Sequence, residues 1–420
     1  MTNVCFYFQV HQPFRMRKYR FFDIGRSDEY FDHDLNKEVC KRLAKDCYLP
    51  ANEIILEKIR DSDGRLKVSF SISGLAIEQF EQYAPEVIDS FKKLAETGCV
   101  EFLGETYYHS LASAFSEKEF DLQVKMHSEK INALFGQKPK VFRNTELIYD
   151  NDVAAFAERA GFTGILSEGA DSVLGWRSPN SIYKPKGTTN ISLIMKNYRL
   201  SDDIAFRFSD KEWSQWPLTA DKFSEWVASS GDNDDTHSIN LFMDYETFGE
   251  HHKKDSGIMG FLADLPGKLI SRDVGFITPS ELISSYEPKV EIDVPTPISW
   301  ADDERDMSAW KSNNMQNNAL SEIFDMEDLV KSSGDARLIQ AWRMLTTSDH
   351  FYYMSTKKRN DGMIHNYFSP YKTPYDSFIS YMNIVNDMSK RLGRDVKKQG
   401  TGSPPGNPGS SSLGSMDMVN

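Results

Sequence analysis

Short runs of apolar and β-branched residues recur along the first part of the chain, and stretches with helical spacing separate them. This alternation favours a parallel α/β architecture. Polar residues follow several different runs, which favours a barrel over a doubly wound sheet. We therefore predict an incomplete TIM-type (β/α)7 barrel. Its strands are expected at residues 4–10, 66–73, 100–104, 140–145, 164–167, 191–196 and 238–244.

The first run is followed by His11-Gln12-Pro13-Phe14, where a nucleotide-binding fold needs a glycine-rich turn. The residues before this run include no basic region, and no small-residue cleavage site follows it. We therefore interpret the N-terminal apolar stretch as a first strand and not as a signal peptide.

The pattern changes after Pro295, and from Asp303 onward it becomes helical. We predict a barrel domain over residues 1–290 and a helical domain over 291–395 that contributes to the active site. Residues 396–420 are rich in Gly, Ser and Pro and are expected to be a disordered tail or a fusion remnant. The last predicted helix should bury Tyr375, Phe378, Ile379, Met382, Val385 and Leu392.

Composition adds limits on partners and compartment. The chain has 420 residues, of which 40% are hydrophobic, so it can bury a large core. Its net charge of −13 argues against nucleic acid or an anionic membrane as the main partner. No run approaches the roughly 18 apolar residues of a spanning helix. The 4 cysteines form no CxxC pair. We expect a soluble cytoplasmic protein.

Two carboxylates follow the seventh run, Asp244 and Glu246. If the strand continues that far, its period of two places both on one side. Like charges held close raise the pKa of one member, which allows a carboxylic acid to keep its proton near neutral pH. An acidic loop at a strand end is the alternative interpretation.

Glu146 follows the fourth run, where barrel enzymes place catalytic groups, although a glutamate in the first turn of a helix would look similar. His11 follows the first run, and it could bind a sugar hydroxyl or be a core histidine.

Five short motifs, in order along most of the chain, resemble glycoside hydrolase family 57, whose members act on α-glucans with a seven-stranded barrel. They are HQP at 11–13, GCVEFL at 98–103, RNTEL at 143–147, MDYETFG at 243–249 and SDHFYY at 348–353. The resemblance implies that Glu146 is the nucleophile and Asp244 the acid/base. It also implies that substrate is contacted by His11, Glu101, Glu246 and Asp349. Cys99 departs from the polar residue that is frequent at its position.

The stretch 300–310 resembles family members described as α-amylases. An aromatic ring beside carboxylates suits a pyranose, so Trp300 is a candidate sugar platform, and packing at the domain junction is the alternative. Trp176 is a second, weaker candidate.

These expectations describe a retaining hydrolase of α-1,4-glucans that needs no cofactor or metal. Retention predicts carboxyl groups about 5 to 5.5 Å apart. A 4-α-glucanotransferase or branching enzyme would use the same pair. A metal-dependent deacetylase is suggested by Glu250-His251-His252, although adjacent histidines usually diverge. A catalytically silent α-glucan-binding protein is the last alternative.

Overall fold

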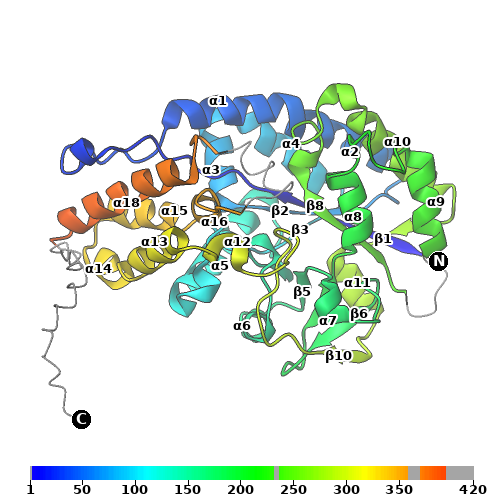
Figure 1. Cartoon of the computed structure of the whole chain (residues 1–420). Coiled ribbons are helices and arrows are strands. Elements are labelled where there is room, and N and C mark those ends of the chain that lie inside the picture. Colours follow the sequence, from blue (N-terminus) through cyan, green and yellow to red (C-terminus); the bar gives the residue numbers. More distant parts are fainter. Residues whose placement is uncertain (1, 231–235, 358–368, 394–420) are drawn as a thin grey trace, which may run out of the picture.

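The computed structural model describes residues 2–230, 236–357 and 369–393. Its centre is a set of parallel strands in the order β8-β1-β2-β3-β4-β5-β7 (Figure 1). A bridge between Gly104 and Phe142 joins β3 to β4. The strands are β1 (Asn3–Val10), β2 (Val68–Ile72), β3 (Val100–Phe102), β4 (Val141–Arg143), β5 (Gly164–Ser167), β7 (Ser192–Met195) and β8 (Ile239–Asp244). Each lies in or within one residue of a predicted run.

The two edges of this set, β7 and β8, meet through single hydrogen bonds and not through a regular ladder. The amide N of Asn197 donates to the carbonyl of Asn240 at 2.9 Å, and the Asn240 side chain donates to the carbonyl of Met195 at 2.9 Å. The result is an incomplete (β/α)7 barrel, as the strand and helix pattern predicted.

Three further strands were not predicted from the sequence. β6 (Ile182–Pro185) lies antiparallel to β7, β10 (Val290–Ile292) lies parallel to β6, and β9 (Gly275–Phe276) pairs with the start of β1. These strands have two to four residues, and Val290 is 46% exposed, so no apolar run marks them.

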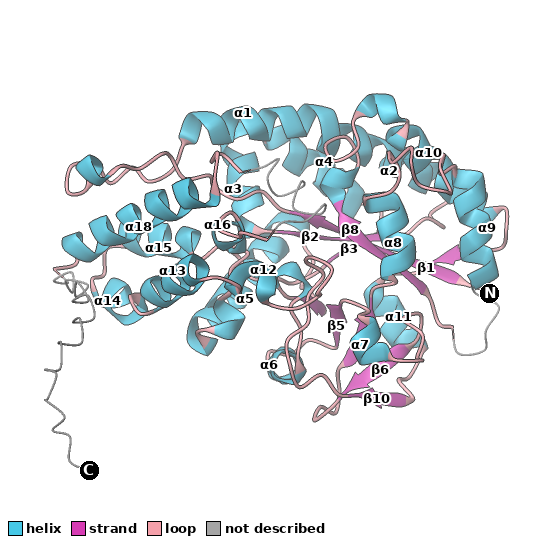
Figure 2. Ribbon diagram, in the orientation of Figure 1, coloured by secondary structure: helices cyan, strands magenta, loops and turns pink. Residues whose placement is uncertain are grey.

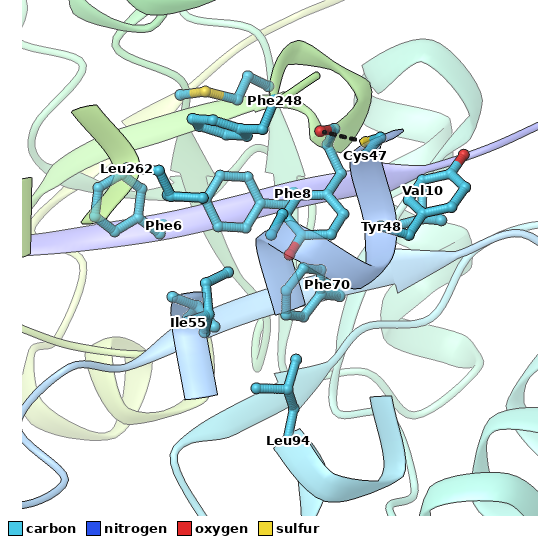
Figure 3. Packing of buried hydrophobic residues seen from close by; sticks show 14 of the residues in the cluster. Phe6, Phe8, Val10, Cys47, Tyr48, Ile55, Phe70, Leu94, Phe248 and Leu262 are labelled. Carbon is cyan, nitrogen blue, oxygen red and sulfur yellow. Dashed lines mark hydrogen bonds between the residues drawn. The ribbon is translucent and has the colours of Figure 1, made fainter. Parts of the chain in front are cut away.

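Helices cover the outside of the barrel (Figure 2). Phe6, Phe8 and Phe70 point outward and pack against Ile55 of α2 and Leu94 of α4 (Figure 3). The intervening residues of β1, such as Tyr7, point inward. The helices of this part of the chain are α1 (His33–Leu43), α2 (Leu49–Asp61), α3 (Gly74–Tyr83), α4 (Pro85–Ala95), α5 (Glu117–Phe135), α6 (Asn151–Arg159), α7 (Asp171–Leu174), α8 (Tyr198–Ala205), α9 (Ala220–Ser230), α10 (Ile258–Ile270) and α11 (Pro279–Ser285).

A group of helices after the barrel packs over one side of it. Their buried cluster includes Phe14, Tyr107 and Tyr108 from barrel loops, and a bridge joins Ser110 to Thr347. These helices therefore share a hydrophobic core with the barrel loops. They are α12 (Ser308–Lys311), α13 (Asn314–Phe324), α14 (Glu327–Ser332), α15 (Ala336–Leu345), α16 (Ser348–Tyr352) and α18 (Pro374–Arg391).

The buried face of α18 differs from the predicted one. Tyr375 and Ile379 are 63% and 56% exposed, so assigning them to the core was wrong. Of the six predicted residues Val385 is fully buried, and Phe378, Met382 and Leu392 are partly buried. The buried face is turned toward the side with small serines, which allow close approach, and its members include Ser377, Ser380, Tyr381, Ile384, Val385 and Met388.

The expected tail at 396–420 lies outside the described residues. Among the described helices, none combines the length and the apolar character needed to span a bilayer.

Candidate active site

Glu146 lies just after β4, in the 3-10 turn η4 (Thr145–Leu147). Its φ of 54° is in the left-handed region, which a residue with a side chain adopts only under constraint. Two donors hold its carboxylate. The Nε2 of His109 lies 3.0 Å from Oε1, and the indole Nε1 of Trp300 donates to Oε2 at 2.7 Å. Two donors of this kind favour the ionised form of a carboxyl group.

His109 connects this carboxylate to a second one. Its Nδ1 lies 3.0 Å from Glu105, which is fully buried on the loop after β3. Burial alone would lower the pKa of His109, but the hydrogen bonds to Glu105 and Glu146 raise it to about 9. Burial likewise raises the pKa of Glu105, but the hydrogen bond and charge of His109 outweigh it and lower that pKa to about 2. His109 is therefore an imidazolium between two carboxylates.

Asp244 is the last residue of β8, beside Gln9 of β1. Within the described part of the chain its carboxylate accepts no hydrogen bond. Burial and the negative charge of Glu146 raise the pKa of Asp244 to about 7, although Arg143 and His109 oppose the shift. A buried carboxyl without donors retains its proton into the neutral range.

Glu246 is beside Asp244 for a different reason from the one predicted. The strand ends at Asp244, and Glu246 lies in the 3-10 turn η5 (Tyr245–Thr247), so the period-two argument does not apply to it. Burial and the charge of Asp244 nevertheless raise the pKa of Glu246. Its Oε1 accepts hydrogen bonds from the Tyr48 hydroxyl at 2.5 Å and from the His11 amide N at 3.4 Å.

Tyr48 reaches this position from an irregular helical segment. It is the last residue of the π-helical turn η2 (Ala44–Tyr48), which connects α1 and α2. The turn packs against the loop after β8 at Gly249, whose φ is +112°. A Cβ at Gly249 would lie 2.1 Å from the carbonyl oxygen of Asp46. Only glycine allows this close approach.

His11 and Asp349 meet across the junction between barrel and helices. The His11 Nε2 lies 3.0 Å from the Asp349 carboxylate, which α16 supplies, and its Nδ1 lies 2.7 Å from the Ser73 hydroxyl. The ring also stacks on His109 with centroids 3.9 Å apart. Burial and the charge of His109 lower the pKa of His11. One ring of this stacked pair is therefore charged at neutral pH and the other is not.

The structure does not bring Glu101 to this group, so the substrate contact implied for it stays a prediction. In the sheet Glu101 pairs with Ser69 of β2, which pairs with Tyr7 of β1. Tyr7 lies three residues before the end of β1, so Glu101 lies below the carboxyl ends of the strands. Its carboxylate accepts hydrogen bonds from the amide N of Ser280, at 2.9 Å, and from the Ser280 hydroxyl, at the first turn of α11. Glu101 therefore stabilises a helix N-terminus inside the barrel, and Glu105 lies at the site instead.

The two candidate sugar platforms have different surroundings. Trp300 is half-buried, and its backbone N donates to the carbonyl of Glu146 at 3.1 Å in addition to its side-chain bond. Trp176 follows α7 and is 93% exposed. The structure thus connects Trp300 to the reacting group and leaves Trp176 at the surface.

The residues that suggested a metal site have other partners. Glu250 pairs with Arg42 and with Lys253, and the ring of His252 contacts the Ser209 hydroxyl and the carbonyl oxygens of Ile204 and Ala205. Among the residues with described positions, no three His, Cys, Asp or Glu side chains converge on a point.

Sequence reasoning did not identify Tyr48, Glu105 or His109. Tyr48 and His109 belong to no quoted motif, and Glu105 lies two residues beyond the second one. Glu105 and His109 are four residues apart in a loop, a spacing that indicates nothing until the loop conformation is known. The nearest available signal was a cluster of polar residues, Glu105-Thr106-Tyr107-Tyr108-His109, directly after a strand.

Comparisons with known proteins identify the family of this chain. The family model described as "Glycosyl hydrolase family 57" matches residues 5–295. A putative alpha-amylase from Methanocaldococcus jannaschii is 43% identical over 402 residues, which cover 91% of this chain and 83% of that protein.

Two solved structures share the fold. The branching enzyme from Pyrococcus horikoshii superposes with a TM-score of 0.68 at 13% identity, over 93% of this chain and 94% of its own. The 4-alpha-glucanotransferase from Thermococcus litoralis superposes with a TM-score of 0.58 at 20% identity, over 84% of this chain and 50% of its own. The chain therefore spans half the length of that transferase.

Proposed function

The chain belongs to glycosyl hydrolase family 57, and we propose that it is a retaining hydrolase of α-1,4-glucans with Glu146 as nucleophile and Asp244 as acid/base. The observation that carries the proposal is the difference between these two carboxyl groups. Two donors hold Glu146, whereas half-buried Asp244 has no donor and its pKa is raised. One is set up to attack and the other to give a proton.

In the first step, an oxygen of Glu146 attacks the anomeric carbon while the carboxylic acid of Asp244 protonates the departing glycosidic oxygen. The carbon–oxygen bond to the leaving chain breaks as the ester bond to Glu146 forms. Asp244 is then a carboxylate. Its new charge lies near Arg143, His109 and Lys196, three cations that favour the ionised form.

In the second step, the Asp244 carboxylate takes a proton from water, and the hydroxide attacks the anomeric carbon from the face that the first chain left. The ester bond breaks, Glu146 returns as a carboxylate, and Asp244 is again an acid. Two inversions give net retention. The separation of about 5 to 5.5 Å between the two carboxyl groups stays a prediction of this mechanism.

His11, Asp349 and Glu246 surround the reacting pair and are proposed to bind sugar hydroxyls. His11 follows β1 and bonds both Asp349 of α16 and Glu246 of η5, and its ring stacks on His109, the partner of Glu146. Hydroxyl groups are both donors and acceptors, so a ring of mixed carboxyl and imidazole groups suits them. A neutral substrate also suits a chain with a net charge of −13.

The test uses two variants that preserve side-chain volume. Glu146→Gln should remove measurable release of reducing ends from soluble starch. Asp244→Asn should lower kcat/KM on starch by about 10²- to 10⁴-fold but keep the first step with an aryl maltooligoside, whose leaving group needs no proton. Circular dichroism should show both variants folded.

The outcomes of this test separate the alternatives. A Glu146→Gln variant with the wild-type rate would remove Glu146 as nucleophile. A wild-type protein that binds glycogen and releases no reducing ends over long incubation would show a silent binding protein.

Transfer to a sugar hydroxyl is the second candidate, and the fold shared with the branching enzyme and the glucanotransferase favours it. The same glycosyl-enzyme would form, and a sugar hydroxyl would replace water. Chromatography of products from maltoheptaose distinguishes the two activities. Only shorter chains are expected from hydrolysis, and chains longer than the substrate would show transfer.

A further inference from the structure

We infer that Trp300 is a positioning residue for Glu146, held in place by Lys196 and Arg143, and that it is not a platform for a sugar ring. The inference rests on the proposed function, since it requires Glu146 to be the nucleophile. Trp300 belongs to the segment that connects the barrel to the helices, so the inference gives this segment a part in the reaction.

Trp300 holds Glu146 at two points. The indole N–H donates to Oε2 at 2.7 Å, and the backbone N–H donates to the carbonyl of the same residue at 3.1 Å. A short antiparallel bridge between Tyr149 and Ile298 aligns the two segments. Glu146 has a left-handed φ of 54°, and such a conformation persists where the surroundings impose it. The two hydrogen bonds from Trp300 and the bridge between Tyr149 and Ile298 impose this conformation on Glu146.

The ring of Trp300 already has cationic partners. The guanidinium carbon of Arg143 lies 4.9 Å from the ring centroid, and the ammonium of Lys196 lies 5.4 Å from it. Arg143 is fully buried, and within the described residues its three nitrogens have no hydrogen-bond partner. The ring and the Glu105 carboxylate, 3.9 Å from a guanidinium nitrogen, are two groups that stabilise this charge at close range. A pyranose would have to displace a buried cation to stack there.

Lys196 is itself fixed by a buried group of charges at the carboxyl ends of β5 and β7. Its ammonium lies 3.0 Å from Asp202 and 3.4 Å from Glu168. Arg305 lies 3.5 Å from Asp202, and its carbonyl accepts a hydrogen bond from Ser299, the residue before Trp300. The same charges thus fix both the cation over the indole ring and the backbone beside it.

This arrangement has a chemical consequence for the nucleophile. A cation over an aromatic face attracts its electrons, which makes the indole N–H a stronger donor. When one oxygen of Glu146 forms the ester, the glycosidic carbon–oxygen bond breaks and the Asp244 proton passes to the leaving oxygen. The other carboxylate oxygen becomes the ester carbonyl. A donor that stays on the carboxyl group orients it for attack and stabilises it as it leaves in the second step.

The decisive variant is Trp300→Phe, which removes the N–H and keeps an aromatic ring for the cations. Its control is Trp342→Phe, since Trp342 has a matching indole bond of 2.7 Å, to the Ile323 carbonyl, and a matching cation, Lys331 at 5.5 Å. For Trp300→Phe we expect kcat on maltoheptaose to fall about 10²-fold while KM changes less than about threefold. For Trp342→Phe we expect a lower Tm and an unchanged kcat.

A sugar platform would give the opposite kinetic pattern. If Trp300→Phe keeps kcat and raises KM, or leaves both unchanged, the inference is overturned. A loss that Trp342→Phe reproduces would also overturn it, because the loss would then follow from stability. If Glu146→Gln is fully active, the proposed function fails. If Glu146→Gln is inactive and Trp300→Phe has wild-type kinetics, only this inference fails.

Lys196→Met and Lys196→Arg test the cation separately. They provide a second measurement if the Trp300 variant does not fold. Lys196 lowers the pKa of Asp244 by its charge. Without this charge the pKa of Asp244 should rise, so Lys196→Met should shift the basic limb of the pH profile of kcat/KM to higher pH. The indole N–H should also become a weaker donor to Glu146, which should lower kcat. Lys196→Arg should restore most of both. Equal profiles for Lys196→Met and the wild type would contradict the role of this cation.

Discussion

His109 lies between two carboxylates and determines how charge is arranged at the site. It pairs with Glu105 on one side and with Glu146 on the other, each at 3.0 Å. A protonated His109 lowers the cost of keeping Glu146 ionised in a buried place. The proton of the reacting pair consequently resides on Asp244, which has no such partner.

This arrangement predicts how activity depends on pH. In the proposed mechanism Asp244 is the acid of the first step and must be protonated there, and burial with the charge of Glu146 raises its pKa to about 7. Activity should be present below that pH and should fall as pH rises through about 7. The measurement is the pH profile of kcat/KM on maltoheptaose.

The residual activity of Asp244→Asn on an aryl maltooligoside provides the control, because it should lack this basic limb. A profile that is flat to pH 9 in the wild type would contradict Asp244 as the acid.

At this scale the sequence allowed prediction of the residues that follow strands. Glu146, Asp244 and His11 lie at or just after strand ends, whereas Asp349 was implied only by the family resemblance and lies in α16. The structure brings these four residues together. The groups that orient them were not predicted, since Tyr48 reaches the site through an irregular helical turn and His109 through a loop. The partners of a loop residue depend on backbone angles that no local pattern specifies.

At the scale of single elements, the barrel uses carboxylates for structure as well as for chemistry. Glu101 accepts two hydrogen bonds from Ser280 at the start of α11, within a family motif that suggested substrate binding. The seven barrel strands were predictable because each lies in a short run of apolar and β-branched residues, whereas β6, β9 and β10 have no such signal. The buried face of α18 was not, because its serines give no apolar signal.

Glu101→Ala tests the structural role of this residue. The variant leaves the partly buried N–H and hydroxyl of Ser280 without this acceptor and should lower the free energy of unfolding by about 1 kcal/mol. Because Glu101 does not reach the reacting groups, kcat below the unfolding transition should stay within about twofold of wild type. Urea denaturation and initial rates measure the two quantities.

The control is Glu291→Gln, which changes a carboxylate at an exposed position on β10. It measures any change in stability or kcat that arises from preparing a variant protein. If the Glu101→Ala protein is stable but loses much of its kcat, Glu101 has a role in the active site.

At the scale of the whole molecule, the helices after the barrel complete the site. Asp349 of α16 pairs with His11 of the barrel, and the hydrophobic cluster that holds α16 includes barrel loop residues such as Phe14 and Tyr108. Residues of the candidate site therefore lie on both sides of the domain boundary that the sequence suggested near residue 290.

This shared core predicts cooperative unfolding. We expect a single calorimetric transition, because the helices lose the buried partners of their apolar faces when the barrel loops unfold. Inactivation should follow the same transition. Two well-separated transitions, with activity retained between them, would show that the helices fold and act independently of the barrel.

The contacts of Glu146 also set when the enzyme becomes active during its synthesis. Its donor Trp300 follows it by 154 positions, and Asp349 comes later still. At the usual 5 to 20 residues per second, the ribosome needs about 10 to 40 s to pass from the nucleophile to the last group of the site. A nascent chain in that interval carries its nucleophile without the residues that orient it. If Glu146 and Asp349 have the proposed roles, the nascent chain becomes able to act on a glucan only after Asp349 has been added and the segment around it has folded.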